Sequence, residues 1–593
     1  MSRRAPRTCA ALAVSLAAAL SAPLALTAPA AADGQYGVTP LRFTVRAGER
    51  TCTVDADLYR PAGADPAHPA PAVLATNGFG GSKDDGSTDA IGKAFARRGY
   101  VSLVYSGLGF GKSGCPISLD DPDIDGRAAS QLIDFLGGRR AADDGTRAGY
   151  VTLDGPGDPR VGMIGGSYGG AVQLATAAVD HRVDALVPMI TWNDLAYSLD
   201  PNNAAGAPDL PGAFKWQWTN GFYLMGESQP LTQPALDPSR INSLTCLHFV
   251  TRACDTVRTL DSGRYPEDAT RRLLSYAHSV SPVSYLGRVK APTLLVQGQA
   301  DSLFNLNEAT ATYQALKAQG TETKMIWQSW GHSGGMTDPA AGELNLAQGN
   351  LETSYVGRRV LAWFDRYLHR DQITGTGPDF AYYRDWIADP AHTYASADRL
   401  PAPGRTLYLS GDGRLVDRRD EVTRGSRTYT NWLVPTSHSE SSLAGIINLP
   451  DPAPYDLAGT HLAWTSEPLS RATDVVGAPR ATLRVRSPKA ERTQRSADAA
   501  DHLVLFAKLY DEAPDGTRTL VHRLVAPVRV PDVTRPFTVT LPGIVHRFEQ
   551  GHRLRFVIAA SDDAYFGNRG VKPVTVVSSP EDTGVLRLPV VQD

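Results

Sequence analysis

The glycine-rich segment around Ser167 limits the possible folds of this chain more than any other stretch. It reads Arg160-Val-Gly-Met-Ile-Gly-Gly-Ser167-Tyr-Gly-Gly170 and continues into a small, mostly apolar run from Ala171 to Ala178. This order predicts a strand, a sharp turn and a helix, with Ser167 on the turn. The backbone of such a serine is strained, and side chains at Gly165 and Gly169 would collide with the strand and the helix. The segment therefore predicts a serine hydroxyl that stands above the edge of a sheet.

The residues on both sides of this segment alternate between strand-like and helix-like patterns. Short apolar or alternating runs predict strands over 41–45, 51–59, 71–77, 100–105, 185–190, 293–298 and 324–328. Helical patterns lie between several of them, at 89–98 and 307–318, and around Leu132 and Leu361. Strands that alternate with helices form a parallel sheet covered on both faces. We therefore predict an α/β catalytic domain over residues 33–375.

Two changes in the sequence pattern divide the rest of the chain. Between about 191 and 290 the alternation stops, and tryptophans and prolines occur with only weak helical periodicity, which indicates a cap inserted into the α/β domain. A polar, proline-bearing stretch over 376–402 is predicted to be a linker. Short alternating strands separated by turns then fill 403–593, so we predict a C-terminal all-β sandwich.

Length and charge exclude some classes of protein. A chain of 593 residues is too long for one hydrophobic core, and a net charge of -3 without a basic run argues against a nucleic-acid partner. Residues 1–32 resemble a signal peptide, because three arginines precede an alanine-rich apolar segment and Ala30-Ala31-Ala32 offers a cleavage site. We therefore expect export to the extracellular space, with no membrane attachment after cleavage.

The cysteines fit an oxidising compartment. Four of them, Cys52, Cys115, Cys246 and Cys254, lie beyond the predicted signal peptide. Four cysteines allow three pairings, and we predict that Cys52 pairs with Cys115 and Cys246 with Cys254. No histidine or second cysteine lies at zinc-finger ligand spacing from any of them, so we predict no metal site.

Two further residues complete a possible arrangement for nucleophilic catalysis. A serine hydroxyl needs a base, and the base needs a carboxylate that fixes its tautomer. In doubly wound hydrolases these follow the serine in the order Asp, His, on loops after successive strands. Here Asp301 follows the predicted strand 293–298, and His332 follows the predicted strand 324–328. The backbone N–H groups of Tyr168 and Phe79 are the predicted oxyanion donors, since the loop at 77–80 should adjoin the serine turn.

Two other motifs are weaker. Gly109-Phe-Gly-Lys-Ser-Gly114 matches a dinucleotide-binding pattern, but Cys115-Pro116 and an acidic stretch follow where a helix should begin. Asp121-Pro-Asp-Ile-Asp125-Gly126 copies the first half of a calcium loop, yet its twelfth position is Leu132 in place of glutamate. We therefore predict no cofactor, and we interpret these aspartates as the acidic start of a helix.

Four of these segments also resemble a known family. Gly-Gly-Ser167-Tyr-Gly-Gly, Gln-Ala-Asp301-Ser-Leu-Phe, Trp-Gly-His332-Ser and His461-Leu-Ala-Trp-Thr-Ser-Glu-Pro-Leu469 look like the X-Pro dipeptidyl-peptidase and cocaine-esterase family. The resemblance covers nearly the whole chain after the signal segment. It implies an α/β-hydrolase domain with an inserted helical cap and a C-terminal jelly-roll. The family commonly has a tyrosine in the oxyanion loop, and the matching position here is Phe79.

The resemblance implies hydrolysis through an acyl-enzyme, with a small peptide or an ester as substrate. An exopeptidase that releases X-Pro dipeptides is the first interpretation, and a carboxylesterase or amino-acid ester hydrolase is the alternative. A binding protein without catalysis, whose jelly-roll recognises carbohydrate, is the rival from another class. A free amino terminus would need an unpaired carboxylate near the acyl pocket, and Asp194 and Asp200 are the candidates for that contact.

Overall fold

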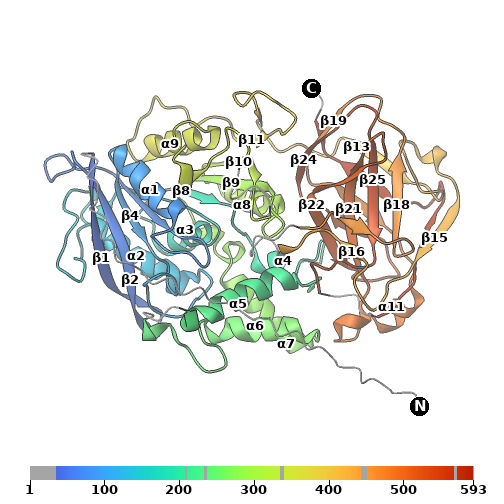
Figure 1. The fold of residues 1–593 in the computed structure, drawn as a ribbon, viewed down its shortest axis with the longest axis horizontal. Coiled ribbons are helices and arrows are strands. Elements are labelled where there is room, and N and C mark those ends of the chain that lie inside the picture. Colours follow the sequence, from blue (N-terminus) through green and yellow to red (C-terminus); the bar gives the residue numbers. More distant parts are fainter. Residues whose placement is uncertain are drawn as a thin grey trace, which may run out of the picture.

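The computed structural model describes residues 35–207, 210–232, 237–333, 339–442, 451–566 and 570–591. The predicted signal peptide lies outside the described residues. In Figure 1 an α/β unit, coloured blue to yellow, lies beside an all-β unit, coloured orange to red. Within the described ranges, no helix has the length and apolar character needed to cross a membrane.

A ten-stranded sheet forms the centre of the α/β unit. Its strands, in spatial order, are β1 (Tyr36–Ala47), β2 (Arg50–Pro61), β4 (Val101–Tyr105), β3 (Ala72–Thr76), β7 (Val161–Gly166), β8 (Val183–Met189), β9 (Thr293–Ala300), β10 (Thr323–Trp330), β11 (Phe380–Tyr383) and β12 (Tyr394–Ala397). The strands from β4 to β11 run parallel, while β1, β2 and β12 are antiparallel to their neighbours. A small hairpin of β5 (Leu153–Gly155) and β6 (Asp158–Pro159) precedes β7. Parallel strands end at one edge of the sheet, so the loops after β3, β7, β9 and β10 meet there.

Helices cover both faces of this sheet. They are α1 (Gly86–Arg97), α2 (Arg127–Leu136), α3 (Tyr168–Val179), α8 (Leu306–Ala318) and α9 (Tyr355–Tyr367). Side chains of α2 and α3 pack into one buried cluster with Leu74, and side chains of α1 and α9 pack into another with Val73. Neighbouring residues of β3 thus point into different cores. This explains why its sequence is apolar throughout and does not alternate.

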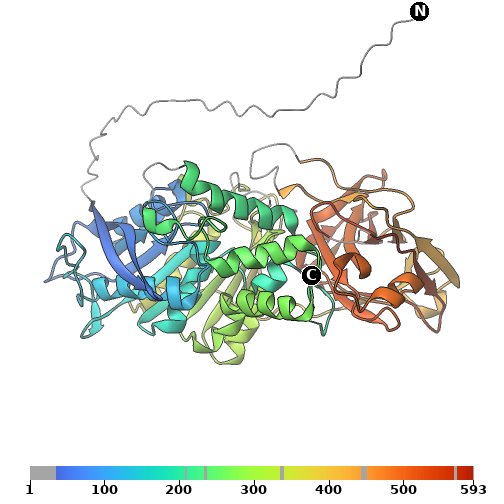
Figure 2. The same ribbon diagram turned by 90° about the horizontal axis from the view of Figure 1, so that it is seen from below.

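The cap lies between β8 and β9. It contains α4 (Leu195–Leu199), α5 (Trp216–Thr232), α6 (Thr251–Ser262) and α7 (Glu267–Ser279). Figure 2 shows its long helices, in green, across the middle of that view, and in Figure 1 they lie at the lower edge of the molecule, below β9 and β10. Three isolated β-bridges connect the segment between β8 and β9 to the all-β unit, namely Ala204 with Val539, Phe214 with Phe566, and Arg264 with Asp498.

The structure contains both predicted disulfides. Cys52 on β2 is bonded to Cys115 on the loop after β4, with a Cα–Cα distance of 5.6 Å. Cys246 is bonded to Cys254 on α6, with a Cα–Cα distance of 5.9 Å. The first bond ties the outer part of the sheet to a loop, and the second fixes the start of a cap helix.

The C-terminal unit is all-β, as the sequence predicts. Its nine-stranded sheet has the order β22 (Arg518–Arg529), β21 (Val504–Glu512), β25 (Arg553–Ala559), β18 (His461–Ser466), β14 (Arg414–Val416), β13 (Arg405–Leu409), β27 (Val585–Leu588), β20 (Arg480–Leu483) and β23 (Phe537–Thr540). Smaller sheets pair β24 (Ile544–Phe548), β19 (Thr473–Gly477) and β28 (Val590–Val591), β15 (Gly425–Tyr429) with β26 (Val574–Ser578), and β16 (Ser437–His438) with β17 (Tyr455–Asp456). A short helix, α11 (Pro488–Thr493), lies between β20 and β21. The fold is therefore an α/β-hydrolase domain followed by a jelly-roll sandwich.

The stretch predicted to be a linker, 376–402, is part of the catalytic domain. It contains β11 and β12, which complete the ten-stranded sheet. All four residues of β11 are buried, so the strand lacks the polar and apolar alternation that marks a half-buried strand. Its short length and the prolines around it made it look like an irregular segment.

Candidate active site

The turn at Ser167 has the strained conformation that the sequence predicts. Ser167 follows β7 and precedes α3, with φ 56° and ψ -119°. A Cβ atom added to Gly165 would lie 2.6 Å from the carbonyl oxygen of Gly169, and one added to Gly169 would lie 2.4 Å from that of Thr76. Neither position accepts a side chain, because such contacts are far below van der Waals separation. The glycines are therefore a steric requirement of this turn.

Asp301 and His332 lie beside Ser167. The Nε2 atom of His332 is 2.9 Å from Ser167 Oγ, and its Nδ1 atom is 2.7 Å from Asp301 Oδ2. Asp301 is fully buried and also accepts a hydrogen bond of 2.8 Å from the backbone N–H of Phe304. A Cβ atom at Gly331 would come within 2.5 Å of the Asp301 side chain, so a glycine there lets the two loops approach.

These contacts determine the roles that the three groups can take. A carboxylate only accepts hydrogen bonds, so Asp301 requires a proton on Nδ1 of His332. The Nε2 atom is then free of hydrogen and accepts the proton of the Ser167 hydroxyl. Hydroxyl, imidazole and carboxylate thus stand in the order needed to generate a nucleophilic serine. The ring of His332 is held edge-on by Phe304 and Trp218, at centroid distances of 5.2 and 6.2 Å.

The predicted oxyanion donors adjoin the same serine. Tyr168 is the first residue of α3, so its N–H has no acceptor within the helix. On the other side, a Cβ atom at Gly78 would lie 3.8 Å from Ser167 Cβ, which brings the loop after β3 into contact with the turn. Asn77 holds that loop, since its amide donates to Gly78 O and its Oδ1 accepts from Gly107 N. The ring of Phe79 packs against four aromatic side chains, those of Phe110, Tyr168, Phe222 and Phe249.

An apolar cavity extends from Ser167 beneath the cap. Its volume is about 110 Å³. Its walls come from the oxyanion loop, the loop after β9 and the cap helices, and include Phe79, Trp192, Leu199, Phe222, Val257, Leu303 and Phe304. No carboxylate or basic group lies among the described residues that line it. The cavity therefore fits an uncharged, apolar group next to the serine.

The structure does not bring Asp194 or Asp200 to this cavity. Asp194 caps α4 by accepting from Ala196 N at 2.9 Å, and its other oxygen lies 3.3 Å from Nε2 of His278. Asp200 is buried, and among the described residues neither of its carboxylate oxygens has a hydrogen-bond partner. Burial raises the pKa of Asp200 to about 7, while the charge of Arg529 acts in the opposite direction. Asp194 and Asp200 therefore belong to the structure of the cap, and neither lines the cavity beside Ser167.

The weaker motifs do not form ligand sites in the described structure. Asp121 caps a π-helical turn, η1 (Pro122–Gly126), by accepting from Asp123 N, while Asp125 accepts from Ser118 Oγ. The aspartates are thus used separately, as the acidic start of a helix. The glycine loop at 109–114 is followed by no immediate helix. Among the described residues, one group has metal-ligand proximity, and its two cysteines, Cys246 and Cys254, are joined in a disulfide.

Sequence reasoning missed a second layer of polar residues around the loop after β9. Lys215 and Trp218 from the cap region, and Glu440 from the C-terminal domain, all bond to Ser302, the residue after Asp301. Lys215 and Glu440 are 4% and 6% exposed. Both lie far from Ser302 in sequence and in segments without periodicity, so no local pattern indicates their positions.

Comparisons with known proteins agree with this fold. A family model described as X-Pro dipeptidyl-peptidase (S15 family) matches residues 51–334. A second, described as the X-Pro dipeptidyl-peptidase C-terminal non-catalytic domain, matches residues 366–577. No curated protein sequence matches the chain at a significant level.

Several solved structures share the fold over almost the full length. An aminopeptidase from a marine sediment archaeon, Thaumarchaeota archaeon, has 16% sequence identity and a TM-score of 0.65, with coverage of 94% of this chain and 97% of that chain. An α-amino acid ester hydrolase has 17% identity and a TM-score of 0.64, with the same coverages. A CocE/NonD family hydrolase from Staphylococcus aureus has 13% identity and a TM-score of 0.59, covering 96% and 99%. The two matching family models cover most of the chain, which therefore belongs to the X-Pro dipeptidyl-peptidase and cocaine-esterase family of serine hydrolases.

Proposed function

We propose that the protein hydrolyses carboxylic esters with an uncharged, apolar acyl group through an acyl-enzyme on Ser167. Ser167 Oγ attacks the ester carbonyl while its proton passes to Nε2 of His332, which Asp301 orients and stabilises as imidazolium. The N–H groups of Tyr168 and Phe79 receive the negative charge that develops on the carbonyl oxygen. His332 then returns the proton to the leaving alcohol. Water repeats the sequence, releases the acid and restores the serine.

The lining of the cavity carries the choice of substrate. An ammonium group next to the acyl site would lose its hydration without gaining a carboxylate, since none lies among the described lining residues. Leu303 and Phe304, which follow Asp301 by two and three residues, both present apolar side chains to the cavity. An alkyl or aryl acyl chain gains by burial against these walls. This favours the ester hydrolase over the X-Pro exopeptidase, the first interpretation from the sequence.

The X-Pro exopeptidase is retained as the second candidate. The observation in its favour is the match of residues 51–334 to the X-Pro dipeptidyl-peptidase family model. An apolar cavity also accepts a proline ring. The two candidates differ in the free amino terminus, which the peptidase must bind and the esterase need not.

Rates on matched substrates would separate the candidates. We expect p-nitrophenyl butanoate and hexanoate to be hydrolysed with kcat/KM far above that for an X-Pro p-nitroanilide. A fluorophosphonate should label the wild-type protein, and Ser167→Ala should lose both labelling and turnover. A higher kcat/KM on the anilide would favour the peptidase. A protein that neither reacts with the phosphonate nor turns over any of these substrates would fit the carbohydrate-binding interpretation.

We further propose that the mature protein acts outside the cell. The two disulfides support an oxidising compartment. The arginine and alanine-rich segment at residues 1–32 supports export with cleavage. N-terminal sequencing of protein recovered from the culture medium should begin near Asp33, and recovery of intact protein only from the cytoplasm would contradict this proposal.

A further inference from the structure

A buried carboxylate of the C-terminal domain reaches the loop that carries Asp301. Glu440 lies just after β16, and its side chain is almost completely covered. Its Oε1 atom accepts hydrogen bonds from Ser302 Oγ, from Trp218 Nε1 at 3.2 Å and from Ser442 Oγ at 3.0 Å. One carboxylate therefore joins three parts of the molecule: the loop after β9, helix α5 of the cap, and the jelly-roll.

The hydrogen bonds continue from Ser302 to the loop that carries His332. Ser302 Oγ lies 2.5 Å from Ser333 Oγ, and Ser302 N donates to Ser333 Oγ at 3.0 Å. The Ser302 hydroxyl donates to Glu440, and the short contact between the Ser302 and Ser333 hydroxyls joins Ser333 to the same network. Ser302 directly follows Asp301, and Ser333 directly follows His332. The chain of hydroxyl groups therefore links the two loops whose separation sets the Asp301–His332 distance.

A buried lysine holds the same loop by its backbone. Lys215 Nζ donates to the carbonyl oxygens of Ser302 and Leu303 at 2.6 and 3.0 Å. Burial lowers the pKa of Lys215 to about 8, while the charges of Glu440, Glu308 and Asp301 act in the opposite direction. Burial raises the pKa of Glu440, and hydrogen bonds from serines and the charge of Lys215 oppose that shift. Glu440 therefore holds the loop through the side chain of Ser302, and Lys215 holds it through the backbone carbonyl groups of Ser302 and Leu303.

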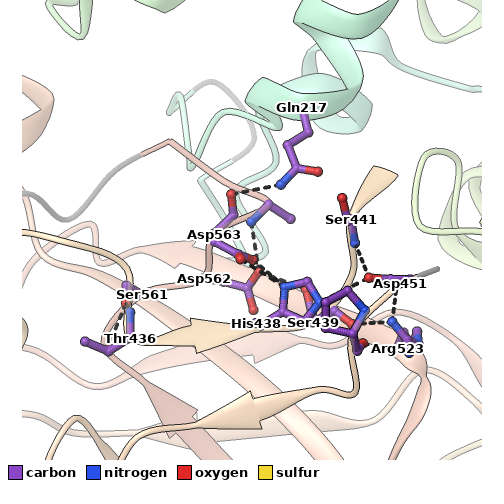
Figure 3. A network of polar contacts seen from close by, with 12 residues as sticks. Gln217, Thr436, His438, Ser439, Ser441, Asp451, Arg523, Ser561, Asp562 and Asp563 are labelled. Carbon is purple, nitrogen blue, oxygen red and sulfur yellow. Dashed lines mark hydrogen bonds and ion pairs between the residues drawn. The ribbon is translucent and has the colours of Figure 1, made fainter. Parts of the chain in front are cut away.

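The segment that carries the carboxylate is itself firmly anchored, as Figure 3 shows. The ring of His438 lies between two aspartates, with Nε2 3.1 Å from Asp451 and Nδ1 2.9 Å from Asp563. Ser441 N donates to Asp451 at 2.9 Å, and Gln217 of α5 donates to the backbone oxygen of Asp563 at 3.2 Å. Contacts on both sides of residue 440 therefore limit its movement relative to the cap.

We propose that Glu440 is a positioning residue of the hydrolase site: through Ser302 and Ser333 it holds the loops of Asp301 and His332 at the separation that catalysis requires. The C-terminal domain then contributes directly to turnover, although Glu440 does not line the acyl cavity. This inference rests on the proposed function, because it presupposes that Ser167, His332 and Asp301 act together. A displacement of about 1 Å in such a group lowers rates by about 10²-fold.

The test compares Glu440→Ala, Glu440→Gln and Ser302→Ala in the full-length protein. We expect Glu440→Ala to lower kcat by about 10- to 100-fold with little change in KM, since the acyl cavity is untouched. Glu440→Gln should retain more activity, because its amide oxygen still accepts from Ser302. In the Ser302→Ala background, Glu440→Ala should lower kcat much less than in the wild type, because the connection is already broken.

Two further readouts separate positioning from loss of structure. Loosening the Asp301 contact destabilises the imidazolium of His332, so the acid limb of kcat/KM should move to lower pH in Glu440→Ala. The matched control is Asp474→Asn, which removes a carboxylate of the same domain that bonds to Arg547 at 2.7 and 2.9 Å. Rates are normalised to folded protein by thermal unfolding. The control should keep the wild-type kcat and acid limb.

The outcomes are distinct. Folded Glu440→Ala with the wild-type kcat and acid limb, or a fall no greater than that of Asp474→Asn, would overturn the role of Glu440. In either case phosphonate labelling of the wild type, lost in Ser167→Ala, would leave the proposed function standing. A wild-type protein that is not labelled and is inert on the ester panel would remove both proposals together.

Discussion

The sharpest test of the apolar cavity is to shorten it. Val257 on α6 lines the cavity and belongs to neither the serine turn nor the loops of Asp301 and His332. Replacing it with phenylalanine adds about four carbon-sized groups at that wall. One water needs about 10–15 Å³ of such a space, so a cavity of about 110 Å³ admits on the order of eight methylene-sized groups. The substitution should remove about half of that room.

The expected magnitude follows from apolar burial. Each buried methylene contributes about 0.8 kcal/mol, or roughly fourfold in kcat/KM where the transition state keeps the contact. In the wild type, kcat/KM should therefore rise steeply from acetate to octanoate esters. In Val257→Phe the last three or four methylenes of the octanoyl chain can no longer be buried in the cavity, which costs about 2–3 kcal/mol. We expect about a 10²-fold loss on octanoate and less than about a threefold change on acetate.

The assay measures kcat/KM for p-nitrophenyl acetate, butanoate, hexanoate and octanoate below their solubility limits. Val283→Phe is the control, because Val283 is 48% exposed and lies outside the cavity. Its chain-length profile should match the wild type. Equal losses on acetate and octanoate in Val257→Phe, or a wild-type profile that does not rise with chain length, would refute the assignment of this cavity to the acyl chain.

Three further predictions concern the rest of the molecule. Asp301→Asn should lower kcat by about 10⁴-fold, because an amide nitrogen toward His332 favours the wrong tautomer; a loss below tenfold in a folded variant would contradict the geometry. Replacing both Cys52 and Cys115 by alanine opens a loop with a sequence separation of 63. This should lower the free energy of unfolding by about 4 kcal/mol in denaturant titrations. A loss under about 1 kcal/mol would argue against a stabilising role of this disulfide. Burial raises the folded-state pKa of Asp200 from 3.8 to about 7, so the wild type should lose stability as the pH rises through that window. Asp200→Asn should then raise the melting temperature near pH 8 and leave it almost unchanged near pH 4, and an equal shift at both would contradict the argument.

Periodicity and order along the chain were sufficient to predict most of the catalytic domain. The run 71–77 indicated β3, and the loops after β9 and β10 were correctly expected to hold Asp301 and His332, which the structure brings to Ser167. These features are local, because a strand, its exit loop and a glycine turn each produce a recognisable sequence pattern within about ten residues.

Features that depend on distant packing could not be predicted in the same way. The strands β11 and β12 are only four residues long, and their neighbours in the sheet define them. Asp194 lies near the cap entrance in sequence, but the N–H groups of α4 and His278 occupy its carboxylate. Glu440 bonds to Ser302 across 138 residues, and nothing around it in the sequence marks that partner. Such contacts are set by how the cap and the jelly-roll dock.

The three bridges between the cap segment and the jelly-roll have a consequence for how substrates enter. Ala204, Phe214 and Arg264 are spread along the segment between β8 and β9, and each is tied to a different part of the C-terminal domain. Swinging the cap aside as one body would break all three ties at once. The size of substrate that can enter is then set by the positions that the cap residues have in this structure. Entry to the cavity depends on rearrangement of side chains while the backbone of the cap stays in place.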